Sequence, residues 1–363
     1  MEAIKQHLEL ESDHGGYEAA AMAKNKIQGF YQSLAKLLRC EPRNIAFATN
    51  ATDAYSRALS AIPFQRGDII LTTREDYVSN QLAFLQLVSR FGISIRYAAT
   101  LPEGGVDPDS VRTMVEKERP RLVAVTHMPT YSGLIQDVAA VGRICREYDI
   151  LYLVDGCQTA GQLDLNMEDI GCDFFSATFR KFLRGPRGTG FLYVSDRVLL
   201  RGLHPLFIDL HSANWTGDDT YRLAESARRF ELWERAYALV LGARAATEYA
   251  LAVKTAEIEQ RVRRLAKDLR RKLGTIDQVE VLDHGPSLGG IVTLRVPGWS
   301  PTNLKAVLDQ AGINCSLVFM ESARFDFQER GIEWALRLSP HYYNLDADLD
   351  EVTGILDEQI NRS

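Results

Sequence analysis

An aspartate and a lysine that could act on one cofactor lie 26 residues apart, each after an apolar run. Asp155 follows residues 151–154 (LYLV), and Lys181 lies in a basic, glycine-rich segment (TFRKFLRGPRGTG) after a second run. A buried carboxylate needs a partner, and a protonated pyridine nitrogen would be one. A lysine on the floor of a cleft can form a Schiff base. Taken alone, Asp155 would be interpreted as a helix-capping residue, and Lys181 as part of a Lys-Arg pair on a surface turn. The spacing of the two favours one site that contains both.

Residues suited to a phosphate lie close to this pair in the sequence or at a similar strand end. Thr178 and Arg180 beside Lys181 offer a hydroxyl and a guanidinium to a phosphate ester. Ala51 and Thr52 lie at a strand-to-helix turn, where backbone N–H groups and the helix dipole attract anions. An ordinary helix cap is the alternative there. A pyridine ring, an aldehyde and a phosphate together predict pyridoxal 5′-phosphate.

The block from residue 151 to 194 resembles the class V aminotransferase family of fold-type I pyridoxal-phosphate enzymes, which includes the cysteine desulfurases. VDGCQ is similar to the family's VDxxQ, and SATFRKFLRGPRGTGFLYV to its lysine segment. RRFELWERA (residues 228–236) and SPHYYN look more like the isopenicillin-N-epimerase-like and hercynylcysteine-sulfoxide-lyase-like branches. The likeness extends over nearly the whole chain.

The resemblance implies a role for each matching residue. Lys181 would form the Schiff base, Asp155 would pair with the ring nitrogen, and Tyr77 of TREDYVSN would stack on the ring; these three are the expected catalytic residues. Arg337 of LRLSPHYYN would bind the substrate carboxylate, and His14 is expected near the substrate. The residues expected at the cofactor are Ala51, Thr52, Tyr77, Thr130, Asp155, Gln158, Thr178, Arg180 and Lys181. No metal site is expected.

Three departures from the desulfurase pattern bear on function. Residues 316–336 contain no cysteine, and Glu321 stands where desulfurases carry their nucleophilic cysteine. Cys315 is interpreted as a buried side chain that packs in the preceding strand. Thr130 stands where desulfurases have an asparagine. Trp233 and Glu234 replace a Gly-Thr that one subunit lends to its neighbour's phosphate. Because persulfide chemistry needs a mobile, exposed thiolate, the sequence predicts an enzyme other than a cysteine desulfurase.

The predicted reaction starts at the Cα of an amino acid, with Lys181 moving the proton. Three alternative reactions follow from this start. The preferred one is elimination by a C–S lyase, followed in order of preference by transamination and epimerisation. The alternative is a non-catalytic member of the fold. Such a protein would be expected to have lost the lysine or the aspartate, and this sequence has both. A dinucleotide-binding fold is disfavoured because no GxGxxG follows the first strand. The substrate side chain stays open.

The elements that would position these residues alternate along the chain. Seven short apolar runs near residues 45–48, 69–71, 95–97, 122–125, 151–154, 174–176 and 190–194 are separated by helical patterns. This alternation predicts an α/β fold with a seven-stranded, mostly parallel sheet. Residues 204–229 are expected to be irregular, and residues 231–273 helical. The predicted division is a large domain at 16–255, a small α+β domain at 256–363 and an N-terminal segment (1–15) packed on the small domain.

Composition sets the remaining expectations. The 363 residues carry a net charge of −6 with no basic block, which argues against nucleic acid or an anionic membrane as partner. No run approaches the length of a membrane span, and the first residues lack a secretory signal. The five cysteines are scattered, so neither a zinc site nor a disulfide framework is indicated. A cytoplasmic homodimer with an amino acid as its small-molecule substrate is expected.

Overall fold

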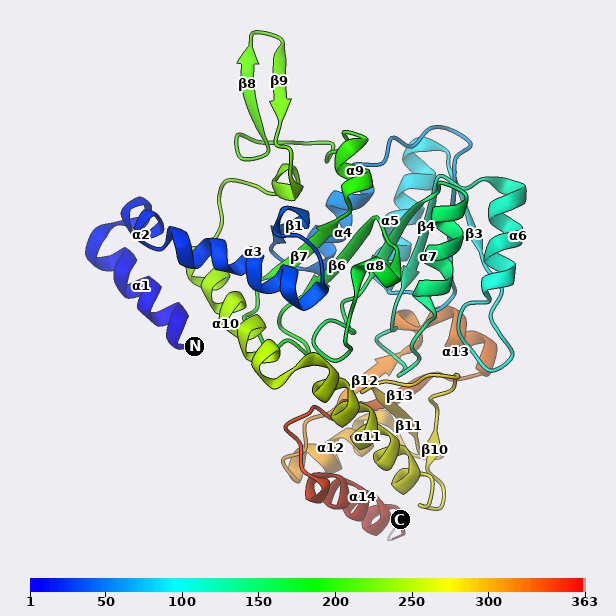
Figure 1. Ribbon diagram of the computed structural model, residues 1–363. Helices are drawn as coiled ribbons and strands as arrows, with labels where there is room; N and C mark the ends of the chain where they lie inside the picture. The colour runs from blue at the N-terminus through cyan, green and yellow to red at the C-terminus, as the bar shows by residue number, and fades with distance from the viewer. Residues whose placement is uncertain (362–363) are drawn as a thin grey trace.

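A seven-stranded sheet forms the centre of the computed structural model, which describes residues 1–361 (Figure 1). Its strand order is β1-β7-β6-β5-β4-β2-β3, and only β7 runs antiparallel to its neighbours. The predicted mostly parallel sheet is therefore confirmed. The strands are β1 (Ile45–Ala48), β2 (Ile69–Thr72), β3 (Ser94–Tyr97), β4 (Leu122–Thr126), β5 (Leu151–Asp155), β6 (Phe174–Thr178) and β7 (Gly190–Val194).

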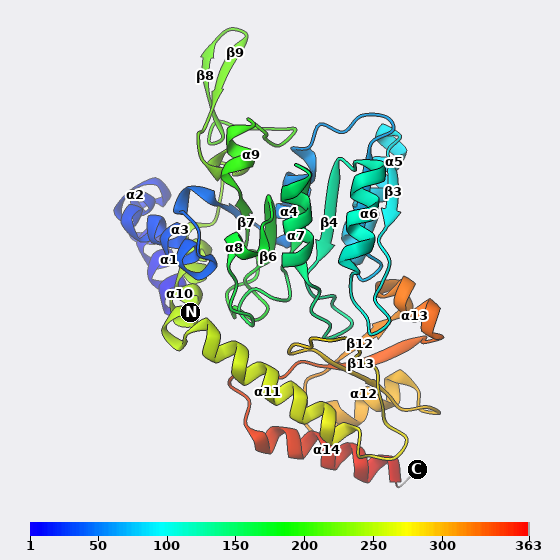
Figure 2. The same ribbon diagram turned by 45° about the vertical axis from the view of Figure 1, so that its right-hand side comes forward.

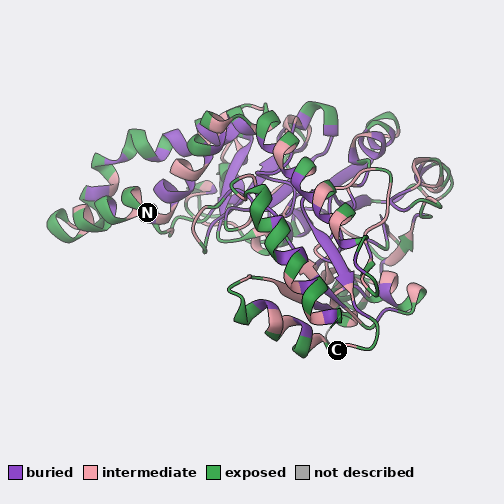
Figure 3. Ribbon diagram, turned by 90° about the horizontal axis from the view of Figure 1, so that it is seen from below, coloured by how far each residue is buried: buried purple, intermediate pink, exposed green. Residues whose placement is uncertain are grey.

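Helices cover both faces of this sheet, which explains why its strands are apolar on both sides. Alternate residues of one strand enter different cores: Tyr152 and Val154 of β5 lie in one, and Leu151 and Leu153 in the other. In the view from below, buried strands lie between helices with exposed outer faces (Figure 3). The first core is covered by α3 (Lys24–Leu38), α6 (Pro108–Glu118), α7 (Val138–Glu147) and α8 (Met167–Ile170), and the second by α4 (Ala51–Ser60), α5 (Val78–Phe91) and α9 (Asp196–Leu200).

Two helices, rather than one, occupy the region predicted as helical from residue 231 to 273. Residues 231–236 are not helical, and α10 (Tyr237–Val253) is separated from α11 (Thr255–Leu273) by Lys254, whose φ is 77°. An L-residue adopts positive φ at a cost, so this residue interrupts the helix. The predicted helical region is therefore present from residue 237 onward, and its division into two helices was not predicted because helical periodicity on both sides does not reveal a break of one residue. The proposed domain boundary falls one residue after Lys254.

A second sheet of four antiparallel strands lies beyond α11, in the order β10-β11-β13-β12 (Figure 2). Helices α11, α12 and α14 pack with this sheet around a core of leucine, valine and isoleucine. The elements are β10 (Glu280–Val281), β11 (Val292–Arg295), α12 (Pro301–Gln310), β12 (Ser316–Phe319), the 3₁₀ turn Met320–Ser322, α13 (Arg324–Arg330), β13 (Trp334–Leu338) and α14 (Asp346–Asn361).

The N-terminal helices do not lie where the sequence suggested. Helix α1 (Glu2–His14) packs against α10 and against α2 (Gly16–Met22), at the opposite end of α10 from the four-stranded sheet (Figure 1). The expectation that residues 1–15 pack on the small domain is therefore wrong for this chain. An amphipathic helix reveals that one face is covered, but its sequence does not say by which element.

Residues 204–229, predicted to be irregular, contain a two-stranded hairpin. Strands β8 (Ala213–Gly217) and β9 (Thr220–Leu223) stand clear of the body at the top of Figure 1. Two 3₁₀ turns complete the chain, at Pro42–Asn44 and Ala227–Phe230. No helix within residues 1–361 has the length and apolarity needed to cross a bilayer.

Candidate active site

The carboxyl ends of three neighbouring parallel strands meet at one edge of the large sheet. Thr126 ends β4, Asp155 ends β5 and Thr178 ends β6. A cavity of about 160 Å³ opens there, where open α/β sheets place ligands. It brings together all nine residues predicted at the cofactor. It is lined by Asn50, Ala51, Thr52, Tyr77, Asn80, Thr126, Met128, Thr130, Asp155, Cys157, Gln158, Thr178, Arg180 and Lys181.

Asp155 is buried and held by two donors. One carboxylate oxygen accepts a 3.0 Å bond from Asn80 Nδ2, and the other a 2.9 Å bond from the Cys157 N–H. Burial raises the pKa of Asp155, while these donors and nearby Lys181 lower it. A cation at the carboxylate would offset the cost of burial. This environment suits a carboxylate that faces a protonated ring nitrogen.

Lys181 is half-buried in a turn directly after β6 and lies beside Cys157 and Asp155. It is part of the wall of the cavity, so its amine is available to a ligand there. The pKa of the neighbouring Cys157 thiol is raised by burial, an effect that Lys181 only partly opposes. The lysine and the aspartate predicted to share one cofactor therefore do meet in one cavity.

The phosphate end predicted at Ala51 and Thr52 is the N-terminus of α4. Asn50 caps this helix by accepting a bond from the Asp53 N–H at 2.9 Å. The neighbouring strand approaches closely here, because Gly190 has no side chain: a Cβ at that position would lie 2.6 Å from the Asn50 carbonyl carbon. Asn50, Ala51 and Thr52 line the cavity together with Thr178, so the N-terminus of α4 lies at a place suited to an anion.

Thr178 and Arg180 both line the cavity, but the Thr178 hydroxyl already has an acceptor. It donates a 3.0 Å bond to the carbonyl oxygen of Thr189. Donation to a phosphate, as predicted, would require this bond to be exchanged. The exposed Arg180 side chain carries no such constraint and can offer its charge directly.

A buried donor without a partner tests whether the residues present fit pyridoxal phosphate. Gln158 Nε2 is buried and has no hydrogen-bond partner within the described part of the chain. An unpaired buried amide is costly, and a phenolic oxygen in the cavity would satisfy it. Tyr77, the residue before α5, presents an aromatic ring to the same cavity. The cavity thus holds a hydrogen-bond donor for the phenolic oxygen, a carboxylate for the ring nitrogen, a lysine for the aldehyde and a helix N-terminus for the phosphate. Together these groups fit pyridoxal phosphate.

Arg337 reaches the edge of the cavity from the small domain. Its strand β13 lies in the four-stranded sheet, and its Nη1 donates a 2.8 Å bond to the carbonyl oxygen of Thr130. Its Nε is buried without a partner among residues 1–361. Burial and the charge of Arg180 lower the pKa of Arg337, and an anion would relieve both. A substrate carboxylate fits this requirement.

His14 is not part of the site. It ends α1, is exposed, and is absent from the residues that line the cavity. The N-terminal helices lie against α10, which keeps His14 away from the cavity of its own chain, so its contact with the substrate stays a prediction. Sequence reasoning also missed Asn50, Asn80, Thr126, Met128 and Cys157, which line the cavity. Asn80 had a signal, since it lies three residues after Tyr77 in the segment already singled out.

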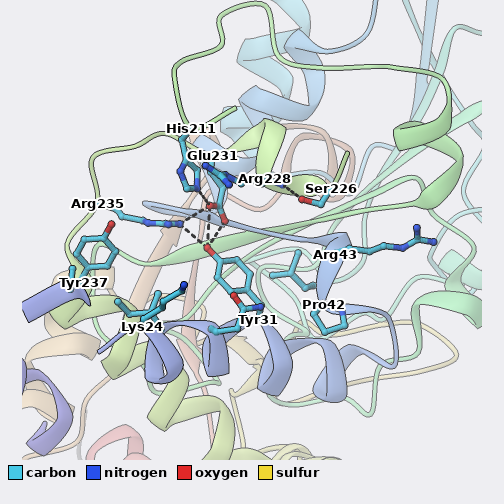
Figure 4. Close-up of a pocket in the computed structure, with 14 residues that line it drawn as sticks. Lys24, Tyr31, Pro42, Arg43, His211, Ser226, Arg228, Glu231, Arg235 and Tyr237 are labelled. Atoms are coloured by element: carbon cyan, nitrogen blue, oxygen red, sulfur yellow. Dashed lines mark hydrogen bonds and ion pairs between the residues drawn. The ribbon is translucent and has the colours of Figure 1, made fainter. Parts of the chain in front are cut away.

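A larger pocket of about 490 Å³ lies away from Lys181, between α3 and residues 226–237. At its wall the buried Glu231 accepts bonds from Tyr31 (2.9 Å), Arg235 (2.6 Å) and the ring of His211 (3.0 Å), which Figure 4 shows converging on one carboxylate. Burial raises the pKa of Glu231, but these partners outweigh it and the net pKa is lowered. The cluster anchors the segment that carries Trp233 and Glu234.

The fold and the cavity define a pyridoxal-phosphate-dependent enzyme. Residues 2–352 match the family model described as Aminotransferase class-V. The chain therefore belongs to the class V aminotransferase family, and the resemblance given above is confirmed.

Relatives similar over nearly the whole chain carry two kinds of name. A probable cysteine desulfurase of Methanothermobacter thermautotrophicus is 28% identical over 351 residues, covering 95% of this chain and 86% of that protein. A probable hercynylcysteine sulfoxide lyase of Mycobacterium tuberculosis is 27% identical over 352 residues, covering 96% and 84%. The structure of the apo cysteine desulfurase of Thermococcus onnurineus NA1 matches with a TM-score of 0.89 at 24% identity, covering 99% and 92%.

These names correct the predicted function. The sequence favoured a β-eliminating C–S lyase, then an aminotransferase or an epimerase, and argued against a cysteine desulfurase. Relatives named cysteine desulfurase match almost the full length, which contradicts that prediction. The missing cysteine in residues 316–336 was given more weight than one short segment carries.

Proposed function

We propose that this chain is a pyridoxal-phosphate-dependent cysteine desulfurase, which removes the sulfur atom of L-cysteine and leaves alanine. The relatives named cysteine desulfurase support the substrate and the reaction. The observation that carries the proposal is the convergence of Lys181 and Asp155 in one cavity, with Arg337 bonded to Thr130 of its wall. These three provide a base, a ring partner and a carboxylate receptor.

Each residue of the cavity has a separate task in this proposal. Pyridoxal phosphate, when bound, withdraws electrons from the substrate carbon. Arg337 binds the substrate carboxylate through its unpartnered Nε, and Lys181 takes and returns the proton at Cα. Asp155 holds a proton at the ring nitrogen.

Two further residues orient the ring. Tyr77 would stack on the ring, and the unpartnered Nε2 of Gln158 would donate to its phenolic oxygen.

The sulfur acceptor requires a thiol, and the loop position used by desulfurases has none. Cys157 is the one cysteine that lines the cavity within residues 1–361, but burial raises the pKa of its thiol, and a protonated thiol is a poor nucleophile. We therefore propose that the sulfur passes to a thiol of another molecule. The acceptor RSH and cysteine would give the persulfide RSSH and alanine, which balances all atoms.

A homodimer in the cytoplasm is part of the same proposal. Large apolar side chains are exposed on the hairpin and around it, including Phe207, Trp215 and Trp233. Clustered exposed apolar side chains are typical of protein interfaces. Five cysteines without a disulfide are compatible with a reducing compartment.

The test is product analysis with L-cysteine and excess dithiothreitol. A desulfurase forms alanine and sulfide in equal amounts, because the thiol reduces the persulfide. Cys157→Ala should form alanine at a similar rate if the acceptor is external. Formation of pyruvate and ammonia in place of alanine would contradict the proposal.

A further inference from the structure

Asp76 is a second buried carboxylate beside Asp155, and no task has yet been given to it. Asp76 precedes Tyr77 and is only 7% exposed, while Asp155 is 4% exposed. Asn80 joins them: its Nδ2 donates to Asp76 Oδ1 and to Asp155 Oδ2, at 3.0 Å each. Two acceptors on one nitrogen lie within about 6 Å of each other, a range in which like charges interact strongly.

The donors around Asp76 are all neutral. They are the Thr126 hydroxyl at 2.5 Å, the Tyr77 N–H at 2.7 Å, Gln81 Nε2 at 2.7 Å and the Thr72 hydroxyl at 3.5 Å, besides Asn80. Within residues 1–361 Asp76 forms no ion pair, so its charge is not cancelled by a neighbour. A carboxylate buried in this way is retained at a cost in stability, unless a cation close by compensates for it.

The ionisable groups that face Asp76 supply no such cation. They are Asp155 of β5 and the phenols of Tyr55 on α4, Tyr97 on β3 and Tyr131, with Lys181 beyond Asp155. Burial raises the pKa of each of these phenols, so they stay neutral. The pKa of Asp76 is itself raised by burial. The nearest place for a compensating cation is the ring-nitrogen end of the cavity, beyond Asp155.

We propose that Asp76 is a positioning residue for the cofactor: through Asn80 it orients the Asp155 carboxylate, and its negative charge keeps the ring nitrogen protonated. Asp76 does not line the cavity, so it acts through Asp155 rather than on the substrate. Two carboxylates in series present more negative potential to the ring than one. Asn80, which donates to both, and the Thr126 hydroxyl, which donates to Asp76, fix their geometry. This inference rests on the proposed pairing of Asp155 with the ring nitrogen.

The experiment follows the ring nitrogen directly. Holoenzyme is reconstituted with ¹⁵N-labelled pyridoxal phosphate, and the nitrogen chemical shift is recorded against pH for the wild type, Asp76→Asn and Glu75→Gln. Glu75 is the matched control, since it is equally buried, also has a raised pKa, and bonds to Thr100 instead of Asn80. We expect Asp76→Asn to lose the ring proton about one pH unit lower than the wild type, and Glu75→Gln to match the wild type.

Cofactor affinity is the second readout, measured by titrating apoprotein with pyridoxal phosphate. Asp76→Asn should bind about tenfold more weakly. If Asp76→Asn does not fold, Asp76→Ser removes the same charge with a smaller side chain. Titration curves that superimpose, or equal shifts in Asp76→Asn and Glu75→Gln, would overturn the inference. Alanine formation is assayed separately, so a wild type that makes no alanine removes the proposed function and leaves the ring-nitrogen result standing.

Discussion

Arg337 Nη1 lies 2.8 Å from the carbonyl oxygen of Thr130, a bond that joins the small domain to the rim of the cofactor cavity. One arm of the guanidinium is thereby fixed, while its buried Nε is left without a partner. A planar fork held at one end is oriented for a carboxylate, and the same bond ties the position of β13 to the site.

Replacing Arg337 by lysine should weaken substrate binding, because an ammonium cannot hold both Thr130 and a carboxylate in a planar arrangement. We expect kcat/KM for L-cysteine to fall about 100-fold, mainly through KM, with cofactor absorbance unchanged. Arg271→Lys, on the exposed side of α11, is the matched control and should behave as the wild type. An unchanged KM in Arg337→Lys would show that the carboxylate binds elsewhere.

Lys181→Ala should remove the covalent link to the cofactor. The visible-edge absorbance band of the wild type should be absent, borohydride should no longer fix the cofactor, and turnover should fall at least about 1,000-fold. Mass spectrometry of the reduced wild type should locate the cofactor on the peptide containing Lys181. Lys36→Ala, on the exposed face of α3, should keep the label. A labelled Lys181→Ala protein would assign the Schiff base to another lysine.

His127 makes stability depend on pH in a predictable direction. Burial lowers its pKa from 6.5 to about 3. Below pH 6.5 the His127 side chain is therefore protonated in the unfolded chain, whereas in the folded chain it stays neutral down to about pH 3. The free energy of unfolding therefore falls as the pH drops through this window. Between pH 7 and pH 5 the wild type should lose about 2 kcal/mol more than His127→Gln, measured by urea unfolding of the apoprotein. Parallel stability curves would show that His127 titrates normally.

The Glu231 cluster should be costly to break. Glu231→Ala leaves Arg235 and Tyr31 without their shared acceptor in a buried place, and we expect a loss of about 3–5 kcal/mol in the free energy of unfolding. Glu248→Ala removes an exposed ion pair with Arg244 on α10, and should cost under about 1 kcal/mol. Similar losses in the two variants would mean that burial of Glu231 adds nothing.

The sequence was sufficient for the sheet and for the cofactor cavity, since both depend on local patterns: apolar runs, and polar residues that directly follow them. Asp155 and Lys181 were found because each ends such a run. Asp76 was missed because the sequence does not show that its side chain turns inward just before α5, whereas Asn80 could have been found from its place three residues after Tyr77. The position of His14 in the fold could not be predicted for a related reason, since nothing local indicates against which surface α1 packs. The predicted function was wrong because the absence of a cysteine in residues 316–336 was given more weight than the similarity of the whole chain to relatives named cysteine desulfurase.

Glu231 also has a consequence for how the chain avoids self-association during folding. Strand β1 is the last strand at one end of the large sheet, where the 3₁₀ turn Ala227–Phe230 packs against it, and Glu231 Oε1 accepts the Phe47 N–H at 2.7 Å. An edge strand with free backbone donors is a template on which another chain can add a strand. Here the buried Glu231 carboxylate accepts a hydrogen bond from one of these donors, the Phe47 N–H. Its negative charge also repels the carbonyl oxygen of an approaching strand. Loss of Glu231 would therefore leave the Phe47 N–H without this acceptor and remove one of the features that protect this edge strand from pairing with another chain.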